Sequence, residues 1–138
     1  MRFLAILILK SHNRCKFLLQ YHMIFVTKYR RNILTPIRER LLDCMSSISR
    51  KCDFEIIKQE IDKDHIHFLI KSYPTLSPNQ ICRVLKQEST VEMWRLFDKY
   101  LRKFYWKENT LWSDGYFVCT VGNASEDIIR RYIETQGR

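Results

Sequence analysis

Hydrophobic and polar positions alternate over residues 64–71, which predicts a β-strand. Successive side chains point to opposite faces of a strand, so His65, His67 and Leu69 share one face and large apolar residues share the other. Residues 54–61 are predicted as a second strand, and the short polar turn between the two predicts an antiparallel hairpin. Residues 18–28 and 116–121 are rich in β-branched and aromatic side chains and are predicted as two further strands.

Apolar residues that recur every three or four positions predict helices between these strands. One helix extends to about residue 51 with Thr35 as its N-cap, and another begins at Ser77 with a proline in its first turn. A third spans residues 91–105, and the last covers about 125–136 with Ser125 as its N-cap. This order predicts a single α+β domain in which helices pack on an antiparallel sheet.

The composition indicates a folded protein with a polyanionic partner. Of 138 residues, 46% are hydrophobic, and 24 basic against 15 acidic residues give a net charge of +9. A charge of this size on one small domain favours nucleic acid as the partner, with an anionic membrane as the second choice. Simple solubility is the alternative explanation of the charge.

The cysteines and the N-terminus favour a cytoplasmic protein. The five cysteines are an odd number without a Cys-x-x-Cys spacing, which is typical of small buried residues rather than a zinc site or a disulfide framework. The apolar run of residues 3–9 is short for a signal peptide, and no stretch approaches the ~20 apolar residues of a membrane span. We therefore expect no membrane association.

Four side chains carry the candidate chemistry. His65 and His67 lie two positions apart on one strand face, close enough for both imidazoles to reach one cation. Tyr132 and Gln136 are four apart and share one face of the last helix. A phenol can act as a nucleophile, and an amide oxygen can complete a metal site. A further histidine, His22, is predicted to be a hydrogen-bonded structural residue.

A basic cluster around an aromatic side chain follows the first long strand. Lys28, Arg30 and Arg31 flank Tyr29, a combination that suits phosphate contacts together with stacking on a base. A solvated charged turn is an equally good interpretation of this cluster.

Four separate blocks resemble one protein family. The segments are YHMIFVTKYRR (21–31), DHIHFLI (64–70), LWSDGYFVCTVGNAS (111–125) and RRYIETQ (130–136). Together they resemble the TnpA-type single-tyrosine transposases of the smallest bacterial and archaeal insertion sequences, which belong to the HUH (His-hydrophobic-His) endonuclease superfamily. The resemblance covers residues 11–136 in the family's order, and it implies a transposase domain at 11–138 with the ferredoxin- or RRM-like HUH core, preceded by a variable extension at 1–10.

The resemblance also implies roles for individual residues. His65, His67 and Gln136 match the ligands of a divalent metal, Mg²⁺ or Mn²⁺, although imidazole ligands alone would favour a transition metal such as zinc. Tyr132 matches the nucleophile that attacks a single-stranded DNA phosphate and forms a 5′-phosphotyrosine. Family members are homodimers, and they recognise DNA hairpins near the element ends.

Two features depart from the family pattern, and two other functions remain open. The apolar start of the chain differs from the family's polar start, and Cys119 stands where serine is expected. One alternative is a domesticated relative that processes repetitive hairpins. The other is a non-catalytic nucleic-acid-binding α+β domain, which would present exposed aromatic residues on its sheet.

Overall fold

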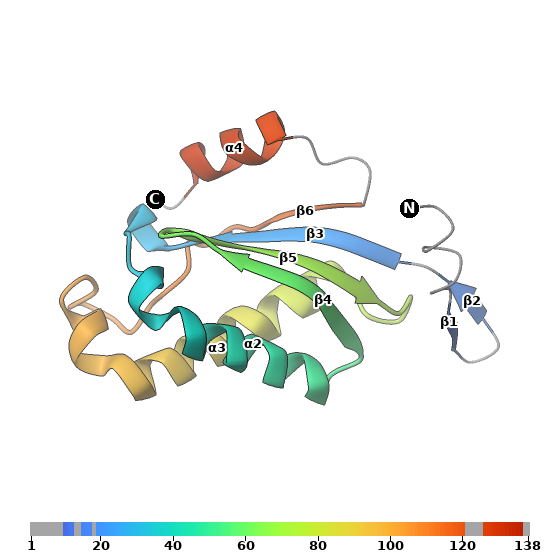
Figure 1. The fold of residues 1–138 in the computed structure, drawn as a ribbon, viewed down its shortest axis with the longest axis horizontal. Helices are drawn as coiled ribbons and strands as arrows, with labels where there is room; N and C mark the ends of the chain where they lie inside the picture. The colour runs from blue at the N-terminus through green and yellow to red at the C-terminus, as the bar shows by residue number, and fades with distance from the viewer. Residues whose placement is uncertain (1–9, 13–14, 18, 121–125, 137–138) are drawn as a thin grey trace.

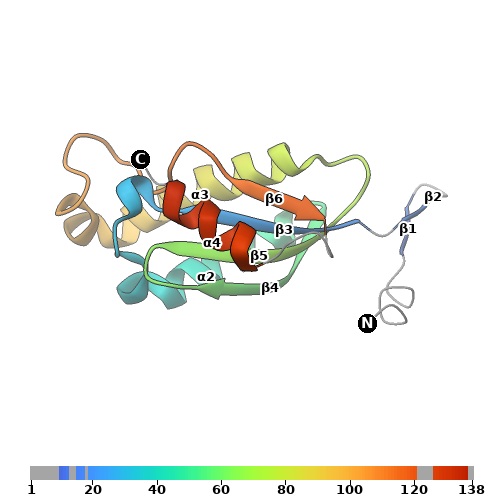
Figure 2. The ribbon, with the colours of Figure 1, turned by 90° about the horizontal axis from the view of Figure 1, so that it is seen from above.

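A four-stranded antiparallel sheet forms the centre of the molecule, with helices on both of its sides (Figures 1 and 2). The computed structural model describes residues 10–12, 15–17, 19–120 and 126–136. In chain order the elements are β1 (Lys10–His12), β2 (Cys15–Phe17), β3 (Leu19–Val26), the 3₁₀ turn η1 (Lys28–Arg30), α2 (Leu34–Lys51), β4 (Phe54–Ile61), β5 (His65–Ser72), α3 (Pro78–Arg102), β6 (Phe117–Thr120) and α4 (Glu126–Thr135). The predicted α+β fold is confirmed.

The sheet order is β4-β5-β3-β6, so the histidine strand β5 lies between two neighbours. β4 and β5 form the predicted antiparallel hairpin, with a register irregularity between Ile56 and Lys58. β3 pairs with β5 along its whole length, and β6 pairs with the middle of β3. The residues opposite each other in one row are Glu60, His67, Ile24 and Phe117.

The core lies between one face of this sheet and the helices α2 and α3 (Figure 1). Phe25 of β3 and Phe68 of β5 are fully buried there, and their rings meet edge to face with centroids 5.3 Å apart. α2 contributes apolar residues at helical spacing: Leu34, Ile37, Leu41, Met45 and Ile48. Because this face holds the apolar side of β5, the alternating histidines must point to the other side of the sheet.

Two helix predictions need correction. α2 begins at Leu34 rather than after Thr35, because the fully buried Ile33 occupies the position before the helix and makes no side-chain cap. Residues 78–102 form one element with a kink at Phe97, so the break lies at residue 97 rather than near residues 89–90, where the two predicted helices were divided. Its interior hydroxyls at Ser89 and Thr90 donate to the carbonyl oxygen of Lys86, so these polar residues do not interrupt it.

The predictions for the start of α3 and for α4 agree with the structure. The Ser77 side chain caps α3 in a capping box with Gln80, as the serine–proline pair predicted. α4 matches the predicted last helix, but its proposed cap Ser125 lies outside the described residues. Most of the proposed extension at 1–10 also lies outside them. In the part of the chain that is described, no helix has the length and apolar character needed to cross a bilayer.

α4 lies on the sheet face opposite to α2 and α3 (Figures 1 and 2). The half-buried residues Ile129, Tyr132 and Ile133 occupy its sheet-facing side, whereas its basic residues are exposed. The helix therefore covers the same sheet face that carries the two histidines of β5.

Candidate functional site

The histidine pair lies where its alternation predicted. Ile66, Phe68 and Ile70 are fully buried on the core side of β5, while His65 and His67 are half-buried on the α4 side. The outer sheet face thus presents two imidazoles beneath a helix.

A buried carboxylate orients His65. Nδ1 of His65 lies 2.9 Å from Oδ1 of Asp64, whose side chain is only 7% exposed. A carboxylate at Nδ1 favours the tautomer that carries its proton there and leaves the lone pair of Nε2 free to bind a cation. The sequence analysis missed this role of Asp64, although the residue directly precedes the histidine.

Arg30 connects this carboxylate to the last helix. Its Nε donates to Oδ2 of Asp64 over 3.3 Å, and its Nη1 donates to the backbone oxygen of Glu134 over 3.2 Å. One guanidinium therefore joins the C-terminal turn of α4 to the residue that orients His65. Arg30 was predicted to contact DNA, but in this arrangement its donors face the protein.

His67 has a partner that the sequence analysis did not assign to the site. Its Nε2 lies 2.9 Å from Nδ1 of His22 on the adjacent strand β3. Burial lowers the pKa of both imidazoles below its usual value, so a neutral pair with one shared proton fits this contact. The two histidines border a cavity of about 180 Å³ that Lys58, Glu60 and Leu69 also line. His22 is hydrogen-bonded, as predicted, but it lies beside the metal-ligand candidate.

Tyr132 lies over the neighbouring part of the same face. Its ring packs on Phe117 of β6 with centroids 5.5 Å apart. The phenol oxygen is buried and has no hydrogen-bond partner among the described residues. Burial raises the pKa of the phenol to about 12, so the hydroxyl is protonated at neutral pH.

Gln136 approaches the same loop as Tyr132. A Cβ placed on Gly115 would lie 3.3 Å from Oε1 of Gln136 and 3.7 Å from the phenol oxygen of Tyr132. Both polar atoms therefore face one glycine just before β6, where an added Cβ would crowd the Gln136 oxygen and make ordinary contact with the Tyr132 oxygen. The predicted proximity of Tyr132 and Gln136 on one helix face agrees with this geometry.

A half-buried lysine supports this loop from the core side. Nζ of Lys86 donates to the backbone oxygens of Ser113, Asp114 and Gly115 over 2.7, 3.2 and 2.6 Å. The ammonium also lies 5.5 Å from the ring centroid of Phe25, and burial lowers its pKa. Lys86 thus fixes the backbone against which Tyr132 and Gln136 rest.

The structure does not bring all four candidate residues into contact. The Tyr132 ring packs on Phe117 of β6, and Ile24 of β3 lies between Phe117 and His67 of β5. Two strand spacings correspond to about 10 Å at the backbone. The described residues contain no cluster of three or more His, Cys, Asp or Glu side chains that could hold a metal. A metal would therefore need the histidine pair together with an amide or ligand oxygen.

The two other basic candidates also differ from each other. Lys28 is mostly buried and forms a 3.5 Å ion pair with the exposed carboxylate of Asp114. The Arg31 residue is exposed on the surface of the turn. Of the three predicted cations, Arg31 is therefore the one most open to a phosphate.

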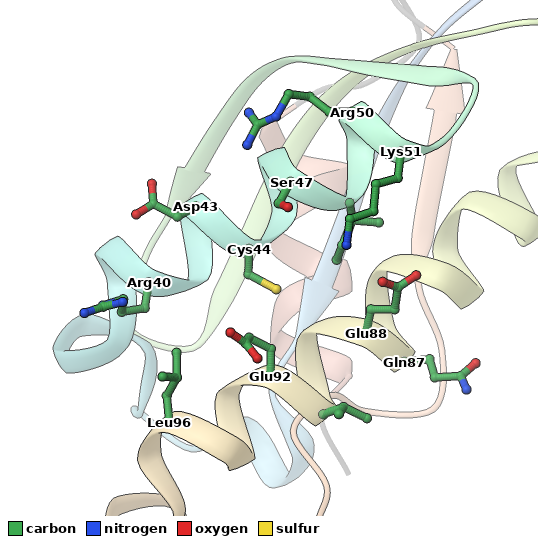
Figure 3. A pocket seen from close by; sticks show the side chains of 12 residues that line it. Arg40, Asp43, Cys44, Ser47, Arg50, Lys51, Gln87, Glu88, Glu92 and Leu96 are labelled. Atoms are coloured by element: carbon green, nitrogen blue, oxygen red, sulfur yellow. The ribbon is translucent and has the colours of Figure 1, made fainter.

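A cavity of about 600 Å³ lies between α2 and α3, on the side of the molecule away from the histidines (Figure 3). Cations such as Arg40 and Lys51 and anions such as Glu88 and Glu92 line it together. Its thiol, Cys44, has a pKa raised by burial to about 11, so it is not a thiolate at neutral pH. This groove has no feature of a catalytic centre.

Comparison with known sequences gives one family. The sequence profile described as "Transposase IS200 like" matches residues 15–136. The ISDra2 transposase TnpA of Deinococcus radiodurans is 30% identical over 119 residues, which cover 86% of this chain and 84% of that protein. The transposase for insertion sequence element IS200 of Salmonella typhimurium is 32% identical over 133 residues, covering 90% and 82%.

Solved structures agree with this result. The crystal structure of a candidate transposase from Deinococcus radiodurans R1 superposes with a TM-score of 0.83 at 28% identity, covering 91% of this chain and 95% of that one. A REP-associated tyrosine transposase bound to a REP hairpin has the same fold, with a TM-score of 0.55 at 12% identity over 91% and 68% of the two chains. The profile spans most of the chain, and this chain belongs to the IS200-like transposase family.

Proposed function

We propose that this transposase is a metal-dependent enzyme that cleaves and rejoins single-stranded DNA at the ends of an insertion sequence, with Tyr132 as its nucleophile. The observation that carries the proposal is the outer sheet face. Two imidazoles project from β5 there, and α4 places on the same face a buried phenol with no partner among the described residues. Membership of a transposase family supports a reaction on DNA.

The donor set fits a divalent cation, Mg²⁺ or Mn²⁺, held by His65, His67 and Gln136. His65 fits because Asp64 already fixes its tautomer. Nε2 of His67 becomes a ligand once its contact with His22 opens. A neutral amide adds an oxygen, and the positions left open suit phosphate and water oxygens. When bound, such a cation polarises a phosphoryl oxygen.

The covalent step exchanges one phosphoester for another. The Tyr132 phenol loses its proton, and its oxygen attacks the DNA phosphorus as the bond from phosphorus to O3′ breaks. The released O3′ takes up a proton, so the products are a 5′-phosphotyrosine and a free 3′-hydroxyl. Attack by another 3′-hydroxyl reverses these steps, which conserves the bond energy during strand transfer.

The partners we propose are DNA hairpins at the element ends and a second copy of this chain. The REP hairpin in the structure of a protein with the same fold supports the hairpin, as does the charge of +9. A domesticated hairpin-processing enzyme would use the same chemistry on other DNA. Exposed sheet aromatics, the feature of an RNA-recognition module, are less suitable here because α4 covers the outer face.

A cleavage assay tests the proposal. Single-stranded DNA from the element ends is incubated with Mn²⁺ and with wild type, Tyr132→Phe or His65→Ala, and covalent adducts are separated on denaturing gels. We expect an adduct in wild type and none in the two variants. Tyr21→Phe is the matched control, since it removes a phenol on β3 and should keep the adduct.

A second measurement separates metal binding from catalysis. Manganese titration followed by electron paramagnetic resonance should show weaker binding by His65→Ala and unchanged binding by Tyr21→Phe. Hairpin binding without an adduct in any metal would favour the non-catalytic DNA-binding domain. Adduct formation by Tyr132→Phe would exclude Tyr132 as the nucleophile.

A further inference from the structure

An aromatic pocket lies beside the candidate centre, between the η1 turn and the loop that follows α3. We define it by Tyr29, Arg31, Phe104, Tyr105, Trp106 and Lys107, and its volume is about 280 Å³. Tyr29 is 58% exposed and Trp106 is 68% exposed, which are large values for residues of this size. Such rings cost free energy when they face water, so a ligand that covers them would be stabilised.

Hydrogen bonds hold both walls of the pocket. The buried Tyr105 forms its floor, and its hydroxyl donates to the backbone oxygen of Lys28 over 2.7 Å. The Trp94 indole donates to the backbone oxygen of Thr110 over 2.8 Å, which fastens the loop after α3. The amide of Lys28 donates to Leu111 over 2.8 Å, so the turn and the loop are joined directly. The pocket is therefore formed before any ligand arrives.

The backbone of the turn is held in an uncommon conformation. Tyr29 and Arg30 both have positive φ angles, 59° and 52°, which non-glycine residues rarely adopt. This geometry sends neighbouring side chains to different places. Tyr29 and Arg31 line the pocket, while Arg30 between them reaches Asp64 and the end of α4. The residues that would contact a ligand in the pocket, Tyr29 and Arg31, are thus the sequence neighbours of Arg30, which contacts the carboxylate that orients His65.

The chemistry of the pocket selects its occupant. Exposed rings stack on flat aromatic ligands. The cations Arg31 and Lys107 outnumber the one carboxylate of the lining, Glu108, and so favour a ligand with an attached negative charge. The volume lies just below the usual range of sites for drug-sized molecules, so it suits one base rather than a longer segment. An unpaired base on a phosphate backbone has all of these properties.

We propose that the aromatic pocket binds one unpaired base of the single-stranded DNA, stacked on Tyr29 and Trp106, with Arg31 and Lys107 on its phosphates. The same turn also carries Arg30, which contacts Asp64 and the end of α4, so the pocket and the candidate centre share one turn. This inference rests on the proposed function in taking single-stranded DNA as the ligand.

The proposal is tested by measuring DNA affinity in proteins that cannot form the covalent adduct. All proteins carry Tyr132→Phe, so no covalent bond contributes, and the probe is a fluorescent 12-nucleotide oligo(dT). We expect Trp106→Ala to weaken binding by about 5- to 150-fold, the range for loss of one stacked base, and Trp106→Phe to retain most of the affinity. Tyr29→Asn should also weaken binding, and asparagine accepts the positive φ at this position. Val91→Ala, an exposed change on α3, is the matched control and should have no effect.

A strand of the same length without bases separates stacking from charge. Trp106→Ala should leave its binding unchanged, because the phosphates remain and only the stacking partner is absent. An equal loss with both strands, or no loss with either, would overturn the proposal. A change of oligomeric state in Trp106→Ala, without a change in DNA affinity, would identify the pocket as an interface between copies and also overturn it. If instead the wild-type protein forms no adduct in the cleavage assay but these variants lose oligo(dT) affinity, the proposed cleavage fails while the base pocket stands.

Discussion

Replacing Lys86 with methionine tests whether a half-buried ammonium holds the loop beneath Tyr132 and Gln136. The native ammonium donates to three successive backbone oxygens, those of Ser113, Asp114 and Gly115. Methionine has a similar length and keeps an apolar contact with Phe25, but it has no donor. The change therefore removes the hydrogen bonds while it keeps most of the volume.

The expected loss of stability follows from these contacts. The bonds to Ser113 and Gly115 are short and partly buried, and each carbonyl left without a donor costs about 1–3 kcal/mol. Removing the charge also relieves its desolvation, the effect that lowers the pKa of Lys86. We therefore expect the free energy of unfolding to fall by about 2–4 kcal/mol rather than by the full sum of both carbonyls.

Urea unfolding monitored by tryptophan fluorescence measures this loss. With a slope of about 2 kcal/mol/M, the midpoint should move down by about 1–2 M. Lys99→Met makes the same chemical change at an exposed position of α3 and should alter the free energy by less than about 0.5 kcal/mol. If Lys86→Met cost no more than Lys99→Met, the three hydrogen bonds would contribute nothing and the reasoning would be refuted.

Four further predictions concern the outer sheet face. Gly115→Ala should speed hydrogen exchange at the end of α4, since the new Cβ would lie 3.3 Å from Oε1 of Gln136, closer than ordinary van der Waals contact; unchanged exchange would contradict this contact. Arg30→Ala should also speed exchange in the last turn of α4, because the bond to the Glu134 oxygen is lost, and it should lower the melting temperature, because the buried carboxylate of Asp64 loses its cation. In an alkaline absorbance titration, Tyr132→Phe should match wild type up to about pH 11, because burial raises the pKa of this phenol to about 12; a difference at pH 10 would show that the ring does not dock in solution. Mixing Tyr132→Phe with His65→Ala should restore about a quarter of the adduct if one subunit supplies the tyrosine to the other, and none if both groups act within one chain.

The alternation of apolar and polar residues and their helical spacing were sufficient to predict the four strands of the sheet. They also predicted on which strand or helix each candidate residue lies. The burial of Ile66, Phe68 and Ile70 decides which face of β5 carries the histidines, and that information lies in the sequence itself. Helix boundaries were less predictable. Residue 33 is apolar and buried at the start of α2, so tertiary burial rather than a capping hydroxyl determines where that helix begins.

The contacts around the histidines could not be predicted, because they depend on strand register and on an unusual turn. His22 meets His67 only because β3 and β5 pair with His22 opposite Leu69. Arg30 turns toward Asp64 because Tyr29 and Arg30 have positive φ angles. A positive φ is usually indicated in a sequence by glycine, and neither of these residues is glycine. The sequence analysis singled out this cation for DNA, which stays a prediction, and did not find its bonds to Asp64 and Glu134.

The separation of the tyrosine from the histidines has a physical cause in this sheet. Tyr132 packs on the edge strand β6, whereas His65 and His67 project from β5, and β3 lies between these strands. The Arg30 guanidinium, which is 44% exposed, joins the end of α4 to Asp64 beside the histidine strand, and so exposed a contact contributes little to holding the helix. The buried phenol without a partner adds a cost to the same docked position. If Tyr132 is the nucleophile we propose, α4 would have to move toward the histidines, and its unpaired hydroxyl lowers the cost of leaving the docked position.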